Sequence, residues 1–203
     1  MAFSARSRHS GKKSEFEQVD AALAFNVKKS IVMVGMMGAG KSAVGQALAA
    51  RLGVAFMDSD EEIVRAANMS IAEIFERDGE AFFRDRETEV IGRLLDTQRA
   101  VLSTGGGAFM SDRNRVMISE RGVSVWLKAD LELLWNRVRH KDTRPLLRTP
   151  DPKATLREIY DARVPTYAKA DLSVDADPDY SIEDMCEAVV TALLTRPDVL
   201  EEV

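Results

Sequence analysis

A glycine-rich stretch carries the strongest chemical signal in the sequence. Residues 35–42 read Gly-Met-Met-Gly-Ala-Gly-Lys-Ser and match the phosphate-binding pattern G-x-x-x-x-G-K-[ST]. The stretch lies between an apolar run at residues 31–34 and a segment of helical periodicity, which is the setting that the pattern requires. Glycines let backbone N–H groups turn toward phosphate oxygens, and the N-terminus of the next helix adds partial positive charge. The pattern predicts nucleotide binding.

Two side chains of this loop have predicted roles of their own. Lys41 can reach the β- and γ-phosphates as a point charge, and the Ser42 hydroxyl is a ligand for magnesium. We therefore expect ATP as the co-substrate and Mg²⁺ as the cofactor. The predicted nucleotide contacts in the loop are Gly38, Ala39, Gly40, Lys41, Ser42 and Ala43.

Two carboxylates follow the next apolar run. Residues 54–57 lead into Asp58-Ser59-Asp60, so both acids lie at the carboxyl end of a strand, where open α/β sheets bind ligands. Asp58 can hold magnesium, directly or through water. Asp60 can orient an acceptor hydroxyl and take its proton during phosphoryl transfer. The alternative, that both acids only cap the next helix, stays open on the sequence alone.

Three glycines and two arginines form the candidate acceptor side. Gly105-Gly106-Gly107 ends the run at residues 100–103 and permits close approach of backbone N–H groups to a ligand, although a plain turn would look the same. Arg84 and Arg163 can together bind a planar anionic group, because guanidinium pairs with carboxylate in a fork. Arg84 with Glu87 three residues later also fits a surface ion pair, and Arg163 also fits a solvated helix residue.

A stretch without periodicity, residues 140–152, is predicted to be a lid. It contains Arg144-Pro145-Leu146-Leu147, and its closure would bring Arg144 to the phosphates and exclude water. Water exclusion favours a transferase over a nucleotide switch. Arg144 could instead only solubilise the loop. His9 and His140 have no Cys or acid cluster beside them, so neither is assigned a metal or nucleophile role.

The elements that must position these residues follow an alternating pattern. Short apolar runs alternate with segments of helical periodicity, which predicts an α/β fold with a parallel sheet whose strands are covered on both faces. The five expected strands are residues 31–34, 54–57, 100–103, 123–127 and 172–174. The expected helices are residues 15–25, 42–52, 70–79, 80–96 and 130–139, with two more that begin at Pro152 and at Ser181.

Composition narrows the class of protein. A chain of 203 residues with 45% hydrophobic and 30% charged residues is typical of one compact globular domain. The net charge of −5 argues against general nucleic-acid binding, and no apolar run approaches the ~20 residues that cross a bilayer. Cys186 is the only cysteine, so the cytoplasm is the expected compartment. Residues 1–14 are basic, rich in serine and free of acids, which predicts an extension without fixed structure, with a targeting peptide as the alternative.

Taken together, the motifs resemble those of the shikimate kinases. Residues 35–167, roughly two-thirds of the chain, carry the P-loop, Asp-Ser-Asp, Gly-Glu-x-x-Phe-Arg, Gly-Gly-Gly and Arg-Pro-Leu-Leu in the order of that family. The resemblance implies transfer of the γ-phosphoryl group of ATP to a hydroxyl of shikimate, giving shikimate 3-phosphate and ADP for aromatic amino acid biosynthesis. It also implies a three-layer P-loop kinase domain with a five-stranded parallel sheet over residues 28–203, an acceptor-binding helical insertion at about residues 60–96, a lid at about residues 140–152, and an extension over residues 1–27.

The resemblance also implies roles for single residues. Asp60 would hold the hydroxyl that is phosphorylated, Arg84 and Arg163 the shikimate carboxylate, and the backbone of Gly106 and Gly107 the ring. Three further roles would belong to the nucleotide side: magnesium at Asp58 and Ser42, ATP phosphates at Arg144, and adenine against Arg137 with help from residues 177–179. Family habit suggests a monomer. The rivals are a kinase for another polyol acid, such as gluconate, and a nucleotide-binding module without transfer activity. The two arginines and the acceptor-side motifs favour shikimate.

Overall fold

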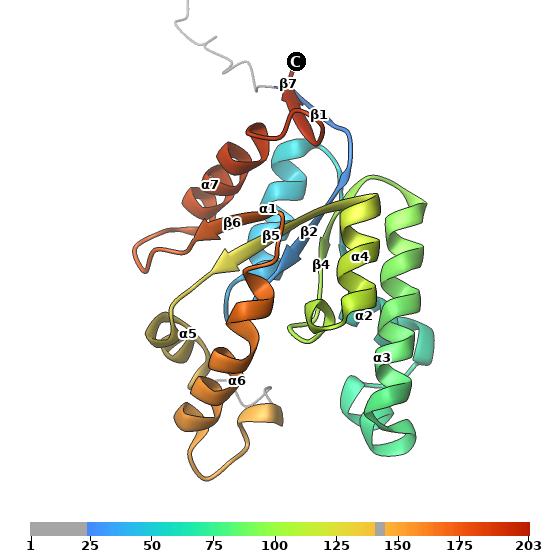
Figure 1. Ribbon diagram of the computed structural model, residues 1–203, viewed down its shortest axis with the longest axis vertical. Helices are drawn as coiled ribbons and strands as arrows, with labels where there is room; N and C mark the ends of the chain where they lie inside the picture. The colour runs from blue at the N-terminus through green and yellow to red at the C-terminus, as the bar shows by residue number, and fades with distance from the viewer. Residues whose placement is uncertain (1–23, 141–144) are drawn as a thin grey trace, which may run out of the picture.

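A five-stranded parallel sheet forms the centre of the protein (Figure 1). The computed structural model describes residues 24–140 and 145–203. The strand order is β3-β4-β2-β5-β6. Each of the five expected runs forms one of these strands, and the ends differ by at most one residue. The strands are β2 (Ser30–Val34), β3 (Ala55–Asp58), β4 (Ala100–Ser103), β5 (Gly122–Lys128) and β6 (Leu172–Asp175).

Helices cover both faces of the sheet, which gives the expected three layers. Helix α1 (Lys41–Leu52) packs with α7 (Ile182–Leu194) on one face, and α3 (Ile71–Thr97) packs with α4 (Asp112–Arg121) on the other (Figure 1). The middle strand β2 is buried along its whole length, whereas β3 at the sheet edge is only partly buried. The expectation of strands covered on both faces therefore holds for the middle of the sheet and is wrong for the two edge strands, β3 and β6.

Local capping signals fix where most helices begin. Asp58 caps α2 (Ser59–Ala67), Asp130 caps α5 (Leu131–Val138), and Asp151 caps α6 (Pro152–Tyr167). Ser70 and Ser181 each open a capping box, before α3 and α7 respectively. These side chains satisfy N–H groups that lack a partner inside the helix, so they stabilise the first turn of each helix.

Gly79 divides α3 into two helical segments. Its backbone angles, φ 84° and ψ 171°, are non-helical and lie in a region that only glycine adopts readily. The expected pair of helices, residues 70–79 and 80–96, therefore meets at a kink rather than at a loop. The kink sets the direction of the second segment, which carries Arg84 and Glu87.

Two short strands and two helices were not among the expected elements. Strand β1 (Phe25–Val27) pairs antiparallel with β7 (Leu200–Glu202), and Lys28 forms an ion pair of 2.6 Å with Glu201. Phe25 is therefore in a strand, so the helix expected over residues 15–25 is wrong at its end, and residues 15–23 lie outside the described chain. Helices α2 and α4 were also absent from the expected elements. No helix among the described residues is long and apolar enough to span a membrane.

Candidate active site

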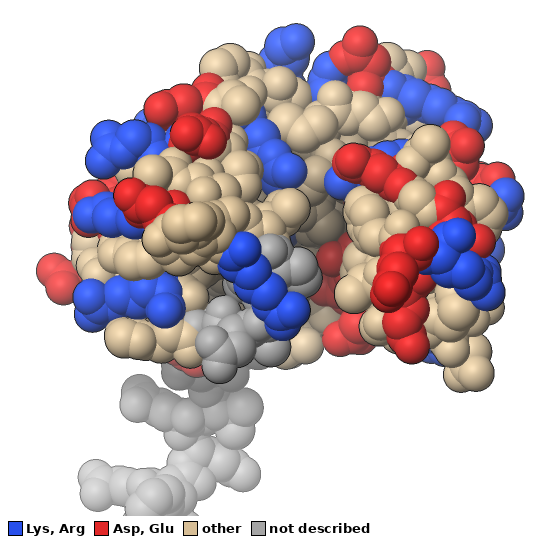
Figure 2. Space-filling model, turned by 90° about the horizontal axis from the view of Figure 1, so that it is seen from below, with Lys and Arg blue, Asp and Glu red and all other residues tan. Residues whose placement is uncertain are grey.

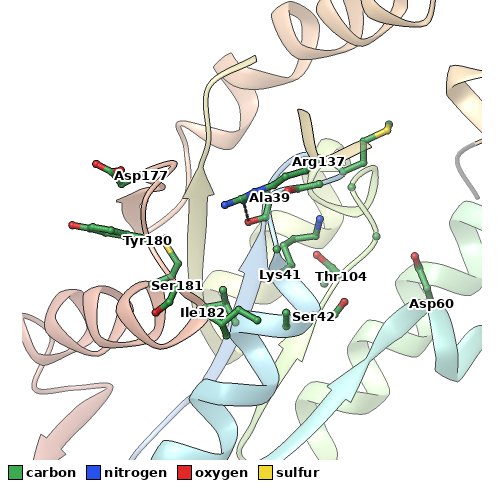
Figure 3. Close-up of a pocket in the computed structure, with 18 residues that line it drawn as sticks. Ala39, Lys41, Ser42, Asp60, Thr104, Arg137, Asp177, Tyr180, Ser181 and Ile182 are labelled. Carbon is green, nitrogen blue, oxygen red and sulfur yellow. Dashed lines mark hydrogen bonds between the residues drawn. The ribbon is translucent and has the colours of Figure 1, made fainter. Parts of the chain in front are cut away.

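A cavity of about 530 Å³ opens at the carboxyl ends of the parallel strands. The face shown in Figure 2 is hollowed near its centre. Figure 3 shows Asp177 and Tyr180 at one end of the cavity, Asp60 at the other, and Lys41 and Ser42 between them. The cavity is lined by Met37, Gly38, Ala39, Gly40, Lys41, Ser42, Ala43, Val44, Asp60, Thr104, Gly105, Gly106, Arg137, Asp177, Tyr180, Ser181, Ile182 and Met185.

The P-loop curls around the middle of this cavity. Gly38 and Gly40 have φ values of 83° and 95°, and a Cβ on Gly38 would lie 2.7 Å from Cγ1 of Val138. Only glycine meets both requirements at position 38. The Lys41 ammonium donates to the carbonyl oxygens of Gly35, at 2.9 Å, and Met36, at 3.1 Å. Lys41 thus lies along the loop, beside the space that phosphates of a nucleotide would take.

Ser42 and Asp58 form an oxygen pair beside the loop. The Ser42 hydroxyl lies 3.0 Å from Oδ2 of Asp58 and 3.2 Å from the Ser103 hydroxyl. The other carboxylate oxygen of Asp58 accepts the N–H groups of Asp60, at 3.0 Å, and Glu61, at 3.4 Å. Asp58 therefore caps α2, which was the alternative role for this residue in the sequence, and it also faces Ser42. Asp60 does not cap the helix but lines the cavity.

The Ser42–Asp58 pair suits a hard divalent cation. Hydroxyl and carboxylate oxygens are ligands of Mg²⁺, which commonly takes its remaining ligands from phosphates and water. Among residues 24–140 and 145–203, no cluster of three or more His, Cys, Asp or Glu side chains could hold a metal ion. The donor set thus fits a cation that arrives with a nucleotide rather than one held by protein ligands alone.

A buried carboxylate lies under the acceptor end of the cavity. Glu87 is 1% exposed, and one of its oxygens accepts from Nη1 of Arg84 at 2.9 Å. A Cβ on Gly105 would lie 2.8 Å from Oδ1 of Asp60 and 3.2 Å from Oε1 of Glu87, so the absent side chain leaves room for both acids. Burial raises the pKa of Glu87, and Asp60 adds to this, whereas Arg84 and Arg163 oppose it. The Arg84–Glu87 pair is therefore not the surface ion pair that its spacing also allowed.

Both candidate arginines lie against the glycine turn. A Cβ on Gly107 would lie 2.7 Å from both terminal nitrogens of Arg84, and a Cβ on Gly106 would lie 3.5 Å from Nη1 of Arg163. Arg84 is carried by α3 and Arg163 by α6, elements that are far apart in the sequence. The fold thus brings two guanidinium groups and Asp60 around one turn of bare backbone.

The other end of the cavity has an apolar rim. Arg137 in α5 approaches the carbonyl oxygens of Gly38 and Ala39, each at 3.4 Å, and lines the cavity (Figure 3). Tyr180 and Ile182 are 45% and 47% exposed and line it as well. Of the expected adenine segment, residues 177–179, only Asp177 is among the lining residues. Sequence reasoning did not assign Tyr180, Ser181, Ile182 or Met185 to the site. The one local signal was the helix start at Ser181, which follows β6 at the edge of the sheet where ligands bind.

One predicted site residue lies outside the described chain. Arg144 belongs to residues 141–144, so its predicted place in a lid remains a prediction. The described part of that stretch includes a short 3₁₀ helix, Pro145–Leu147, in which Leu147 is buried. The described residues of the site belong to the P-loop with the start of α1, the ends of β3 and β4, helices α2, α3, α5 and α6, and the connection from β6 into α7.

Comparison with known proteins agrees with this geometry. The family model for shikimate kinase matches residues 37–194. A shikimate kinase of Ruegeria pomeroyi is 72% identical over 173 residues, which cover 85% of this chain and 89% of that protein. A shikimate kinase of Cereibacter sphaeroides is 60% identical over 201 residues, which cover 99% of this chain and 98% of that protein.

The fold is also shared with a solved structure. A shikimate kinase from Acinetobacter baumannii, solved in complex with shikimate, superposes with a TM-score of 0.79 and 37% sequence identity, and the match covers 83% of this chain and 94% of that one. These two relatives and this solved structure all carry the name shikimate kinase. The chain belongs to the shikimate kinase family of ATP-dependent small-molecule kinases.

Proposed function

We propose that the cavity binds ATP at its P-loop and Tyr180 end and shikimate at its Asp60 end, and that the γ-phosphoryl group passes between them. The observation that carries this proposal is the convergence of Asp60, Arg84 and Arg163 on the glycine turn. Asp60 lies at the opposite end of the cavity from Tyr180, with Lys41 between them (Figure 3). A nucleotide with its phosphates in the P-loop would direct its terminal phosphate toward Asp60.

On the acceptor side, two cations and bare backbone recognise the substrate. Arg84 and Arg163 bind the shikimate carboxylate, since paired guanidinium groups match a planar anion. The backbone at Gly106 and Gly107 contacts the ring, because an absent side chain allows close approach. Glu87 holds Arg84 by the ion pair of 2.9 Å, so the guanidinium keeps one orientation before substrate arrives.

Asp60 orients the hydroxyl that is phosphorylated. The acceptor oxygen forms its bond to the γ-phosphorus while the bond from that phosphorus to the bridging oxygen of ADP breaks, and the hydroxyl proton passes to the Asp60 carboxylate. A carboxylate is a weak base for an alcohol, but in a loose transition state the proton leaves late, so orientation matters more than basicity. Lys41 stabilises the charge on the transferred group, and Arg144 from the predicted lid adds a second cation.

The nucleotide side uses the remaining predicted residues. Ser42 and Asp58 hold Mg²⁺, which neutralises phosphate charge when bound. The N–H groups of the loop from Gly38 to Ala43 bind phosphate oxygens, and the Arg137 guanidinium stacks on adenine. We further propose that the protein is a monomer and that it acts in the cytoplasm. The single cysteine of the sequence, Cys186, is consistent with a reducing compartment and so supports the cytoplasm.

An ADP-release assay with Mg²⁺ and ATP tests the acceptor. Shikimate, gluconate and no acceptor are compared, and ADP release with shikimate alone is the expected result. Release with gluconate at a similar rate would contradict the assignment of the carboxylate pocket. Binding of ATP without turnover on shikimate would leave the P-loop interpretation intact and would remove Asp60, Arg84 and Arg163 from their proposed roles.

Substitutions test the single residues. Arg84→Ala and Arg163→Ala should each raise the shikimate KM at least about tenfold, because a lost charge-assisted pair costs about 1.5 to 3 kcal/mol. The exposed arginines Arg86 and Arg157, one on each of the same helices, provide matched controls. Asp60→Asn should keep ATP binding and lower kcat by about 10²-fold or more. Normal kcat in that variant would exclude the role of Asp60.

A further inference from the structure

Tyr167 connects the acceptor helix to the glycine turn. It is the last residue of α6, one helical turn after Arg163, and it is fully buried. Its ring stacks between Trp126, with centroids 6.1 Å apart, and Phe109, with centroids 6.4 Å apart. Its hydroxyl donates to the carbonyl oxygen of Gly106 at 2.5 Å. Neither ring nor hydroxyl has a role in the phosphoryl transfer proposed above.

Gly106 lies where three parts of the site meet. A Cβ on this residue would be 3.5 Å from Nη1 of Arg163, 3.6 Å from the Gly35 carbonyl oxygen and 3.6 Å from the Tyr167 hydroxyl. The Gly35 carbonyl in turn accepts from Lys41. The backbone at Gly106 is therefore bonded to the acceptor helix through Tyr167 and lies close to the first glycine of the P-loop.

The hydroxyl is needed for orientation rather than for packing. A phenylalanine would fill the space between the two aromatic neighbours equally well, and a buried hydroxyl without a partner costs free energy. Three consecutive glycines have little of their own to limit their backbone angles. In a trans peptide the carbonyl and the next N–H point in opposite directions. Holding the Gly106 carbonyl toward α6 consequently fixes the direction of the Gly107 N–H.

We propose that Tyr167 is a positioning residue for the acceptor: its hydroxyl holds the Gly106–Gly107 peptide in the orientation that binds the shikimate ring and keeps it in register with Arg163. This inference rests on the proposed acceptor roles of Gly106, Gly107 and Arg163. Burial raises the pKa of Tyr167 to about 12, so its hydroxyl stays protonated and remains a donor through the physiological pH range.

Tyr167→Phe in the full chain tests the proposal. The shikimate KM should rise about five- to twentyfold, as expected for one lost hydrogen bond, while the ATP KM stays within about twofold. The matched control is Tyr160→Phe, which removes a hydroxyl from a half-buried tyrosine of the same helix and should leave both KM values unchanged. A merely structural role would lower the melting temperature without this split between the two substrates. An unchanged shikimate KM, or an equal rise in both KM values, would overturn the proposal.

One further variant and one further condition complete the test. Arg163→Ala separates this inference from the proposed function. An unchanged shikimate KM in Arg163→Ala would overturn the acceptor site and the role of Tyr167 with it. A raised shikimate KM in Arg163→Ala together with an unchanged shikimate KM in Tyr167→Phe would overturn the role of Tyr167 alone. Should Tyr167→Phe fail to fold in plain buffer, both KM values are measured in a stabilising osmolyte such as trimethylamine N-oxide, with the wild type in the same solution. The same split between the two substrates is expected, and an unchanged shikimate KM there would overturn the proposal.

Discussion

The hydroxyl of Ser42 donates a hydrogen bond of 3.0 Å to Oδ2 of Asp58 and so joins the first turn of α1 to the end of β3. The second oxygen of Asp58 is held by two N–H groups of α2. Donors on both oxygens fix the carboxylate in one orientation. A cation that reaches this position would find its two protein oxygens already arranged.

Asp58→Asn should separate the metal role of this residue from its capping role. Asparagine caps helices as well as aspartate does, so we expect the melting temperature to change by less than about 3 °C. The missing charge should raise the Mg²⁺ concentration for half-maximal rate at least about fivefold, because hard cations bind charged oxygens more strongly than neutral ones. Initial rates at fixed ATP and varied free Mg²⁺ measure this.

Asp175→Asn is the matched control for Asp58. Asp175 also ends a strand of the same sheet, but it is exposed and forms an ion pair with Lys128. Its substitution should leave the Mg²⁺ dependence unchanged. An equal response of both variants, or an Asp58→Asn variant with normal Mg²⁺ dependence, would contradict the metal role.

Local signals explain why most of the fold was predictable. The five strands are short apolar runs with glycine or acid after them, and the helix starts carry capping side chains, so each signal lies within a few residues of the feature. The β1–β7 pair has no such signal, because Phe25 and Glu202 come from opposite ends of the described chain. In α4 only Asn114 and Ile118 are buried, which leaves almost no apolar periodicity to detect.

The residues of the site also fall into those that local sequence signals predict and those that depend on packing between distant segments. The P-loop is contiguous, so its residues could be assigned from sequence spacing. The burial of Glu87 depends on how the second segment of α3 packs beneath Gly105, which no spacing rule contains. The rim at Tyr180 and Ile182 depends on where the N-terminus of α7 lies relative to Arg137, and this is set by the sheet order.

Gly79→Ala should damage the acceptor site from a distance. A Cβ at Gly79 would meet nothing within 4 Å, so the whole effect comes from backbone angles that cost a non-glycine residue about 1 to 3 kcal/mol. Relief of that strain would redirect the segment that carries Arg84. We expect a lower free energy of unfolding and a shikimate KM raised at least about threefold, with the ATP KM unchanged.

Gly53→Ala provides the comparison for Gly79. Gly53 also has a positive φ, 66°, and open space around its Cβ position, but it ends α1 on the opposite side of the sheet from α3. It should lower stability by about 1 to 2 kcal/mol and leave both KM values alone. Chemical unfolding and steady-state kinetics give the two readouts. A normal shikimate KM in Gly79→Ala would exclude the link from the kink to Arg84.

Glu87→Gln should become relatively more stable as pH rises. Burial raises the pKa of Glu87 in the folded protein above its ordinary value of 4.5, so ionisation above about pH 4.5 costs the wild type stability that it has at lower pH. Glutamine does not ionise. The difference in unfolding free energy, variant minus wild type, should therefore increase from pH 4.5 to 7. Glu89→Gln, at an exposed position of the same helix, is the matched control, and an equal trend in both variants would contradict the role of burial at Glu87.

Arg137→Met should weaken nucleotide binding alone. Methionine keeps an unbranched apolar stem and removes the guanidinium that the proposed adenine stacking uses, an interaction of about 1 to 2 kcal/mol. The ATP KM should rise about fivefold or more while the shikimate KM stays within about twofold. The neighbouring exposed Arg139 gives the control substitution Arg139→Met. Similar ATP KM values for the two variants would contradict the placement of adenine.

Tyr167 should make the protein sensitive to alkaline unfolding. Its pKa is raised from 10.0 to about 12 in the folded protein by burial, so the folded state holds the hydroxyl proton more tightly than the unfolded chain does. The resulting stability is fully present below pH 10 and is lost as the pH rises to about 12. Two pKa units correspond to roughly 2 to 3 kcal/mol. Tyr167→Phe, although less stable at pH 9, lacks this loss, and the two unfolding free energies should converge between pH 10 and 12. Tyr160→Phe serves as the reference in urea unfolding, and a gap between wild type and Tyr167→Phe that stays constant with pH would mean that the hydroxyl is not held as a buried donor.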